Sequence, residues 1–145
     1  MTDYYFPGNG TGVIITARPV VARNGVWTGD WQDRITYQSI SDGGSNTFLA
    51  GEMHFESDKL NMTPYNGPMF NGSELPAHSR VGGPGVPILS PSQEPADVYG
   101  FGSAHPGVCN FVRSDGSTSS MAVSLDTVVL ANLCNRADGN TDVGQ

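Results

Sequence analysis

Residues 99–117 read Tyr-Gly-Phe-Gly-Ser-Ala-His-Pro-Gly-Val-Cys-Asn-Phe-Val-Arg-Ser-Asp-Gly-Ser, and this stretch decides the fold. A His-Pro-Gly corner begins at His105, an alternating apolar run extends from Val108 to Val112, and Asp115-Gly116 follows. An Asp-Gly pair flanked by alternating apolar residues is a strong signal for a β-hairpin. We therefore expect paired strands near residues 108–113 and 119–124.

Further patterns along the chain predict more strands and a single helix. Strands are expected at residues 12–17, at 34–40, at 47–55 and directly after the Asn24-Gly25 turn. Gly51 predicts a bulge or a close backbone approach. Asp126 is placed to cap a helix over residues 127–136 that stops at Gly139. The expected fold is mainly β within the α+β class: an antiparallel sheet with tight hairpins and one short C-terminal helix.

The size of the chain indicates one domain, residues 1–145. Its 19 glycines and 10 prolines predict many turns and few long helices. Residues 61–97 show no periodicity and are rich in Pro and Gly, so they read as a long loop that is either a functional surface or an excursion packed on the sheet. Residues 1–22 read as an extended segment that is suited to pair with the sheet edge of a neighbouring subunit.

The net charge of −7 narrows the choice of partners. Nucleic-acid binding depends on basic residues that neutralise phosphates, and the chain has no basic cluster. An anionic membrane surface is an equally poor partner. No run of eighteen apolar residues exists, so the sequence predicts no transmembrane helix. An acidic chain rich in Asn and Gly suits an extracellular or cell-surface location.

Three segments carry a resemblance to a known family. They are His105 with Asp115-Gly116 at a His-x9-Asp-Gly spacing, the block from Asp42-Gly-Gly-Ser-Asn46-Thr to Gly51-Glu52, and the tail Leu130-Ala-Asn-Leu-Cys-Asn-Arg-Ala-Asp-Gly139. Together they resemble bacterial prepilin-like proteins of unknown function, best known from planctomycetes.

The resemblance implies a function without chemistry. It indicates the β-rich globular part of a pilin-like or pseudopilin-like subunit, a non-enzymatic extracellular structural protein that assembles with copies of itself. Members of that family open with a pilin-type processing site and a long apolar helix. Neither is found in these 145 residues, so membrane anchoring is not carried over.

Catalytic and metal sites can be weighed against simpler roles. His105, Asp115 and a serine could form a triad, but the Gly-x-Ser-x-Gly pattern is absent and both residues sit in turn sequences. We therefore expect no catalytic residue. The three histidines, His54, His78 and His105, are too scattered for a zinc site. Calcium ligands are available in turn-like segments, at Asp42, Asn46, Asp115, Asp126, Asp138 and Asp142.

These acidic turns leave a second class of function open, a calcium-dependent or carbohydrate-binding adhesion module. No cofactor is required by the sequence, and calcium is possible. The aromatic residues Tyr4 to Phe6, Trp27 and Trp31 are either a sugar platform or part of the core or of a subunit contact.

Two kinds of covalent modification are also open. Cys109 and Cys134 either form a disulfide, contributing roughly 3–4 kcal/mol by loop entropy, or remain buried thiols. Three sequons offer glycan acceptors in predicted loops, at Asn9, Asn61 and Asn71.

Overall fold

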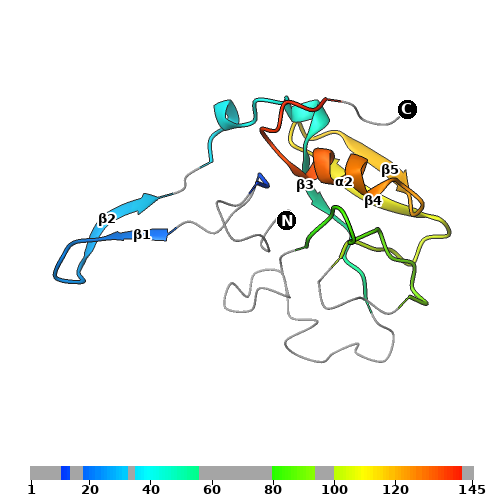
Figure 1. Ribbon diagram of the computed structural model, residues 1–145, viewed down its shortest axis with the longest axis horizontal. Helices are drawn as coiled ribbons and strands as arrows, with labels where there is room; N and C mark the ends of the chain where they lie inside the picture. Colours follow the sequence, from blue (N-terminus) through cyan, green and yellow to red (C-terminus); the bar gives the residue numbers. More distant parts are fainter. Residues whose placement is uncertain (1–10, 14–17, 33–34, 56–79, 94–99, 142–145) are drawn as a thin grey trace.

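The computed structural model of the chain describes residues 11–13, 18–32, 35–55, 80–93 and 100–141. These ranges contain two antiparallel sheets, of two and three strands, and one α-helix (Figure 1). The strands are β1 (Arg18–Val21), β2 (Trp27–Gln32), β3 (Phe48–Gly51), β4 (Val108–Arg113) and β5 (Thr118–Ala122), and the helix is α2 (Thr127–Cys134). The expected mainly β fold is confirmed for these residues. None of the helices within them has the length and apolar character needed to cross a bilayer.

The β4–β5 hairpin forms where the Asp-Gly signal predicts it. Its register pairs Val108 with Ala122 and continues without a shift to the turn. Gly116 has φ +87°, a left-handed conformation that glycine adopts at no steric cost. Asp115 fixes the turn, because its Oδ1 accepts the Ser117 backbone N–H at 2.9 Å and the Ser117 hydroxyl at 2.6 Å. The first predicted strand is confirmed, and the second begins and ends slightly earlier than predicted.

Strand β3 pairs with β4 from far away in the sequence, giving the sheet order β3-β4-β5. The register shifts between Phe48 and Ala50, and a Cβ added to Gly51 would lie 2.5 Å from the Phe111 ring. Of the two alternatives predicted for Gly51, the close approach is present, and the irregularity of the ladder lies before it, between Phe48 and Ala50. Close approach allows the Phe48 and Phe111 rings to stack with their centroids 4.1 Å apart.

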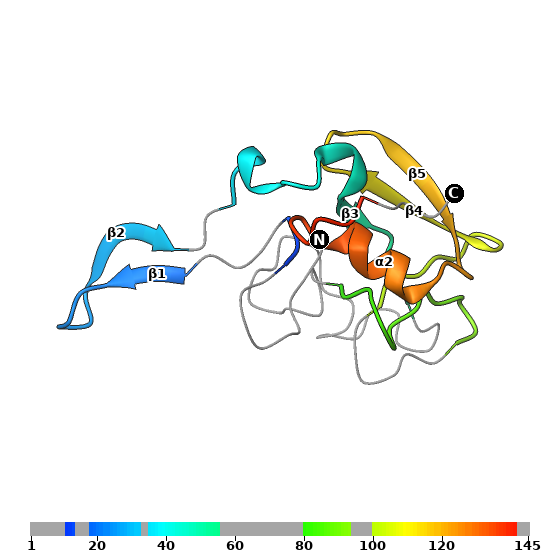
Figure 2. The ribbon, with the colours of Figure 1, turned by 45° about the horizontal axis from the view of Figure 1, so that its top comes forward.

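The core lies between one face of this sheet and α2 (Figures 1 and 2). Its buried members from the sheet side are Phe48, Phe101, Cys109 and Phe111, and those from the helix are Leu130, Leu133 and Cys134. Asp126 caps the helix, because its Oδ1 accepts the backbone N–H groups of Val128 and Val129. The helix ends at Cys134, two residues before the predicted end at Arg136, because Asn135 has extended φ and ψ angles.

One prediction for the N-terminal half is corrected. The described part of residues 34–40, residues 35–40, does not form a strand: it contains a 3-10 helix, η1 (Tyr37–Ser39), because Thr36 and Ser39 exchange capping hydrogen bonds. In the extended segment 1–22, Arg18–Val21 pair with β2 of the same chain across the predicted Asn24-Gly25 turn, and pairing with a neighbouring subunit stays a prediction. Residues 1–10 and 14–17, and with them most of the strand predicted at 12–17, lie outside the described residues.

Residues 80–93 are the described part of the predicted long loop. They contain isolated bridges and no strand or helix, and the bridges Val81 to Gly100 and Leu89 to Gly102 attach them to the segment before β4. Ile88 and Leu89 are buried. These residues therefore form a loop that is attached to the segment before β4.

Candidate functional site

Asp42 joins two segments that lie far apart in the sequence. Its Oδ2 accepts the Asp138 backbone N–H at 2.8 Å and its Oδ1 accepts the Gly139 backbone N–H at 3.0 Å. The residue is only 6% exposed. Asn46, in the 3-10 helix η2 (Gly44–Asn46), donates from Nδ2 to the Asp42 carbonyl at 2.9 Å, which holds the carboxylate's own turn.

Arg136 extends this junction to a third segment. Its Nη1 donates to the Gly12 carbonyl at 2.8 Å, and its backbone N–H donates to the Thr11 carbonyl at 3.0 Å. Its own carbonyl accepts the Asp42 backbone N–H at 3.3 Å. The tail segment quoted above therefore contacts both the Asp42 block and the segment 11–12.

The two Asp-Gly turns also meet. The Asp115 backbone N–H donates to the Gly44 carbonyl at 3.2 Å, and a Cβ at Gly44 would lie 3.2 Å from that nitrogen. The hydrogen bonds from the Ser117 hydroxyl and backbone N–H lower the pKa of Asp115. Its carboxylate serves a local turn, whereas that of Asp42 ties distant segments.

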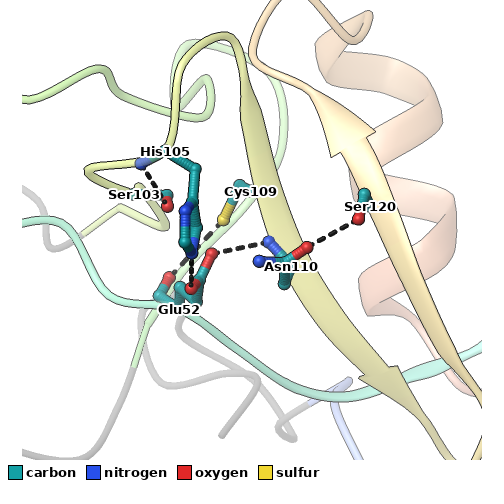
Figure 3. A network of polar contacts seen from close by, with 6 residues as sticks. All are labelled: Glu52, Ser103, His105, Cys109, Asn110 and Ser120. Carbon is teal, nitrogen blue, oxygen red and sulfur yellow. Dashed lines mark hydrogen bonds and ion pairs between the residues drawn. The ribbon is translucent and has the colours of Figure 1, made fainter.

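His105 pairs with a carboxylate other than the one at the end of its signature. Its Nε2 lies 3.1 Å from Glu52 Oε1, as Figure 3 shows. The second Glu52 oxygen, Oε2, accepts the Asn110 backbone N–H at 2.7 Å. Asn110 Oδ1 in turn accepts the Ser120 hydroxyl at 2.6 Å, so the network runs from the end of β3 across β4 to β5 (Figure 3).

The electrostatics of the network favour a charged Glu52 and a neutral thiol. Partial burial acts to raise the pKa of Glu52, but hydrogen bonds from Asn110 and Ser103 and the nearby His105 outweigh it, so the pKa is lowered. Burial, aided by the charge of Glu52, raises the pKa of Cys109 to about 12. Because the thiolate is the nucleophilic form, this shift disfavours nucleophilic chemistry at Cys109 at neutral pH.

The network does not contain an activated nucleophile. The Ser103 hydroxyl accepts the His105 backbone N–H at 3.0 Å rather than donating to the imidazole. The side chains of His105 and Glu52 are 56% and 35% exposed, so the pair faces solvent outside a closed pocket. What the arrangement can do is fasten the His-Pro-Gly corner to the end of β3.

Metal ligands are not gathered in the described residues: no group of three His, Cys, Asp or Glu side chains there could hold an ion. Asp126 caps α2, and Asp138 Oδ1 accepts the Asn140 backbone N–H at 2.8 Å. His54 is buried. Two candidates fall outside the described residues, His78 and Asp142.

The remaining candidates are placed as follows. Neither cysteine forms a disulfide, so the structure has Cys109 and Cys134 as buried thiols; the Cys109 Sγ lies 3.8 Å from the Glu52 carbonyl. Trp27 is 53% exposed on β2. The sequons at Asn9, Asn61 and Asn71, the Tyr4–Phe6 aromatics and the Trp31 side chain lie outside the described part.

A trough of about 580 Å³ lies on the other face of the three-stranded sheet. Its lining is mainly apolar, and Asn110 and Ser120 are among its polar members. Along β4, Asn110 alternates with Phe111, whose side chain packs in the core. The other lining residues come from the same three strands and from Glu52: Ala50, Gly51, Glu52, Phe111, Val112, Thr118 and Ser119.

Comparison with known proteins identifies the family. A family model described as a protein of unknown function, DUF1559, matches residues 1–127. The chain belongs to the DUF1559 family. The matched range contains Glu52, His105 and Asp115-Gly116, and it ends before the tail that contacts Asp42. No curated protein matches this DUF1559 chain, and no solved structure does.

Two functional contacts were missed from the sequence. Glu52 ends a quoted block, yet no spacing rule connects it with His105. Arg136 was expected inside the helix, where its reach to Gly12 could not be foreseen. Both residues belong to segments that carry the family resemblance: Glu52 to the block that begins at Asp42, and Arg136 to the tail that ends at Gly139. The resemblance singles out these segments but does not indicate which residues they contact.

Proposed function

We propose that this DUF1559 protein is a non-enzymatic structural subunit of a pilin-like assembly at the cell surface or outside the cell. The observation that carries the proposal is that the polar residues of the resemblance form hydrogen bonds and an ion pair that join segments of the fold. Asp42 accepts two backbone N–H groups from the tail, Asp115 fixes its own turn, and His105 is paired with Glu52. Residues used in this way build a rigid domain and leave little for chemistry.

Two further observations support the proposal. The resemblance to prepilin-like proteins rests on these same residues, and membership of a family of unknown function does not conflict with it. The pKa of Cys109 is raised to about 12, which disfavours the nucleophilic thiolate form of this side chain.

Assembly is tested with the purified chain at increasing concentration. We expect mass-resolved light scattering to show growth above the monomer and negative-stain electron microscopy to show regular polymers. A monomer at every concentration would refute the structural role, and hydrolysis of a substrate that depends on His105 would refute the non-enzymatic one.

Glycan binding is the second candidate, and the trough on the three-stranded sheet favours it. Glu52, Asn110 and Ser120 offer the hydrogen-bond donors and acceptors that sugars require. Retention on a glycan array that is lost in Asn110→Ala would support this function. A calcium-linked rise in melting temperature would support the calcium-dependent form of it.

A further inference from the structure

The middle of the β1–β2 hairpin, residues 21–30, has little of its surface covered by the described part of the protein. Residues 21–30 are all exposed, and three large apolar side chains are among them: Val21 at 56%, Val26 at 60% and Trp27 at 53%. Figures 1 and 2 both show the hairpin projecting from the body as an arm. An isolated two-stranded hairpin is marginally stable in water, and clustered exposed apolar residues mark contact surfaces. The arm is therefore built to gain a partner.

The three-stranded sheet offers an edge, β5, that no other strand of the described residues covers. Within the described residues β5 pairs only with β4, and its sequence Thr-Ser-Ser-Met-Ala contains no charge and no proline. Its register with β4 has no bulge. Charges, prolines and bulges are the features with which natural sheets block an edge, because an open edge accepts another strand.

The β5 ladder shows which backbone groups face outward. The hydrogen bonds from Arg113 to Ser117 and from Val123 to Gly107 flank the ladder and fix its alternation. By that alternation, the backbone N–H and C=O groups of Thr118, Ser120 and Ala122 point away from β4. These three residues are exposed, so a fourth strand has room to bind.

The occupant that fits is the arm of a second copy. Residues 18–32 hold two arginines and one aspartate, a formal charge of +1, in a chain whose net charge is −7. The arm is thus attracted to a body that otherwise repels its copies. Strand β2 has six residues and β5 has five. The register of β1 with β2 shifts between Pro19 and Val21, and Gly29 in β2 has φ +93°, so the part of β2 away from this irregularity is the part that can pair regularly with β5. Strand β1 is a poorer donor because Pro19 lacks the N–H that pairing needs. Both views place the arm and β5 at opposite ends of the molecule, so the arm is placed for another copy's edge rather than its own (Figures 1 and 2).

We propose that β2 of one copy pairs with the β5 edge of the next copy, extending its sheet. This inference rests on the proposed assembly function and names its contact. Donor and acceptor are different surfaces of the same chain, so the contact is head-to-tail and produces rings or open filaments.

The acceptor edge is tested at Ser120. Ser120→Pro removes one outward N–H, while Ser120→Ala keeps it and loses the same hydroxyl contact with Asn110, so the pair isolates the backbone group. Ser120→Lys places a charge on the edge and serves as a second acceptor variant if the proline variant does not fold. We expect Pro and Lys to raise the concentration of half-assembly by about tenfold or more, and Ala to leave it nearly unchanged.

The donor arm is tested with a double variant, Val21→Ser with Trp27→Ser, whose positions are cross-strand partners. Val128→Ser is the matched control, because Val128 lies on α2 and is also 56% exposed. We expect the double variant to lose assembly and the control to keep it. Mixing the double variant, which has an intact β5, with Ser120→Pro, which has an intact arm, should give a 1:1 complex in sedimentation velocity and no polymer.

The outcomes separate this inference from the function on which it rests. Wild-type polymers that persist unchanged in both the acceptor and the donor variants would overturn the β2–β5 contact and leave the structural role standing on another surface. Wild-type chains that stay monomeric would overturn both.

Discussion

Asp42 is expected to contribute far more to stability than Asp115, although each precedes a glycine in a similar turn. Asp42→Ala removes two hydrogen bonds to a charged acceptor, 2.8 and 3.0 Å long, from a side chain that is 6% exposed. Each such bond contributes about 1.5 kcal/mol at the lower end of its range. The lower end applies because Asp138 and Gly139 are exposed, so their freed N–H groups can bind water. The expected loss is about 3 kcal/mol.

The control is Asp115→Ala, whose carboxylate accepts only the neighbouring Ser117 groups on an exposed turn. It should cost much less than Asp42→Ala, because water replaces the hydrogen bonds of an exposed turn. Asp42→Asn keeps one acceptor oxygen and should fall between, at about 2 kcal/mol. Urea unfolding followed by circular dichroism measures all three. Equal losses for the two alanine variants would refute the claim that Asp42 joins distant segments while Asp115 serves a local turn.

Three further predictions concern the sheet. Gly51→Ala should destabilise the protein by about 1–3 kcal/mol, since the new Cβ would clash with the Phe111 ring. The control is Gly100→Ala, whose Cβ would lie 3.4 Å from its nearest neighbour, the Pro87 carbonyl oxygen; it should cost under about 1 kcal/mol in the same urea titration. The pKa of Glu52 is lowered from its ordinary value of 4.5, so its stabilisation is present above that pH and is lost as the pH falls through the folded value; the gap in unfolding free energy between wild type and Glu52→Gln should therefore be largest near neutral pH and close in acid, and a gap that widens in acid would contradict this sign. Cys109, with its pKa raised to about 12, should resist iodoacetamide in the native protein at pH 8 and react after unfolding, as read by mass spectrometry of its peptide.

Local signals in the sequence predicted local structure well. The Asp115-Gly116 turn gave the β4 bounds, and Asp126 gave the start of α2, because both depend on bonds to residues within three positions. The strand predicted at 34–40 failed for the same kind of reason. Its alternating pattern was outweighed by the mutual capping of Thr36 and Ser39, which stabilises a 3-10 turn.

The contacts that make the candidate site are long-range, and a single sequence does not name partners at long range. Glu52 meets His105, and Asp42 meets the 138–139 backbone, only after β3 has paired with β4. Turn chemistry placed His105 and Asp42 in turns, but it could not show that their partners would be Glu52 and the tail.

The junction at Asp42 also constrains the order of events during synthesis. Residues 136–139 follow every strand and helix of the described body in the sequence, and they hold both Asp42 and the 11–12 segment. A nascent chain that has not yet released these residues from the ribosome lacks the groups that close its early half. Contacts between such distant positions slow folding, so the domain acquires its full resistance to unfolding only after that late stretch has emerged.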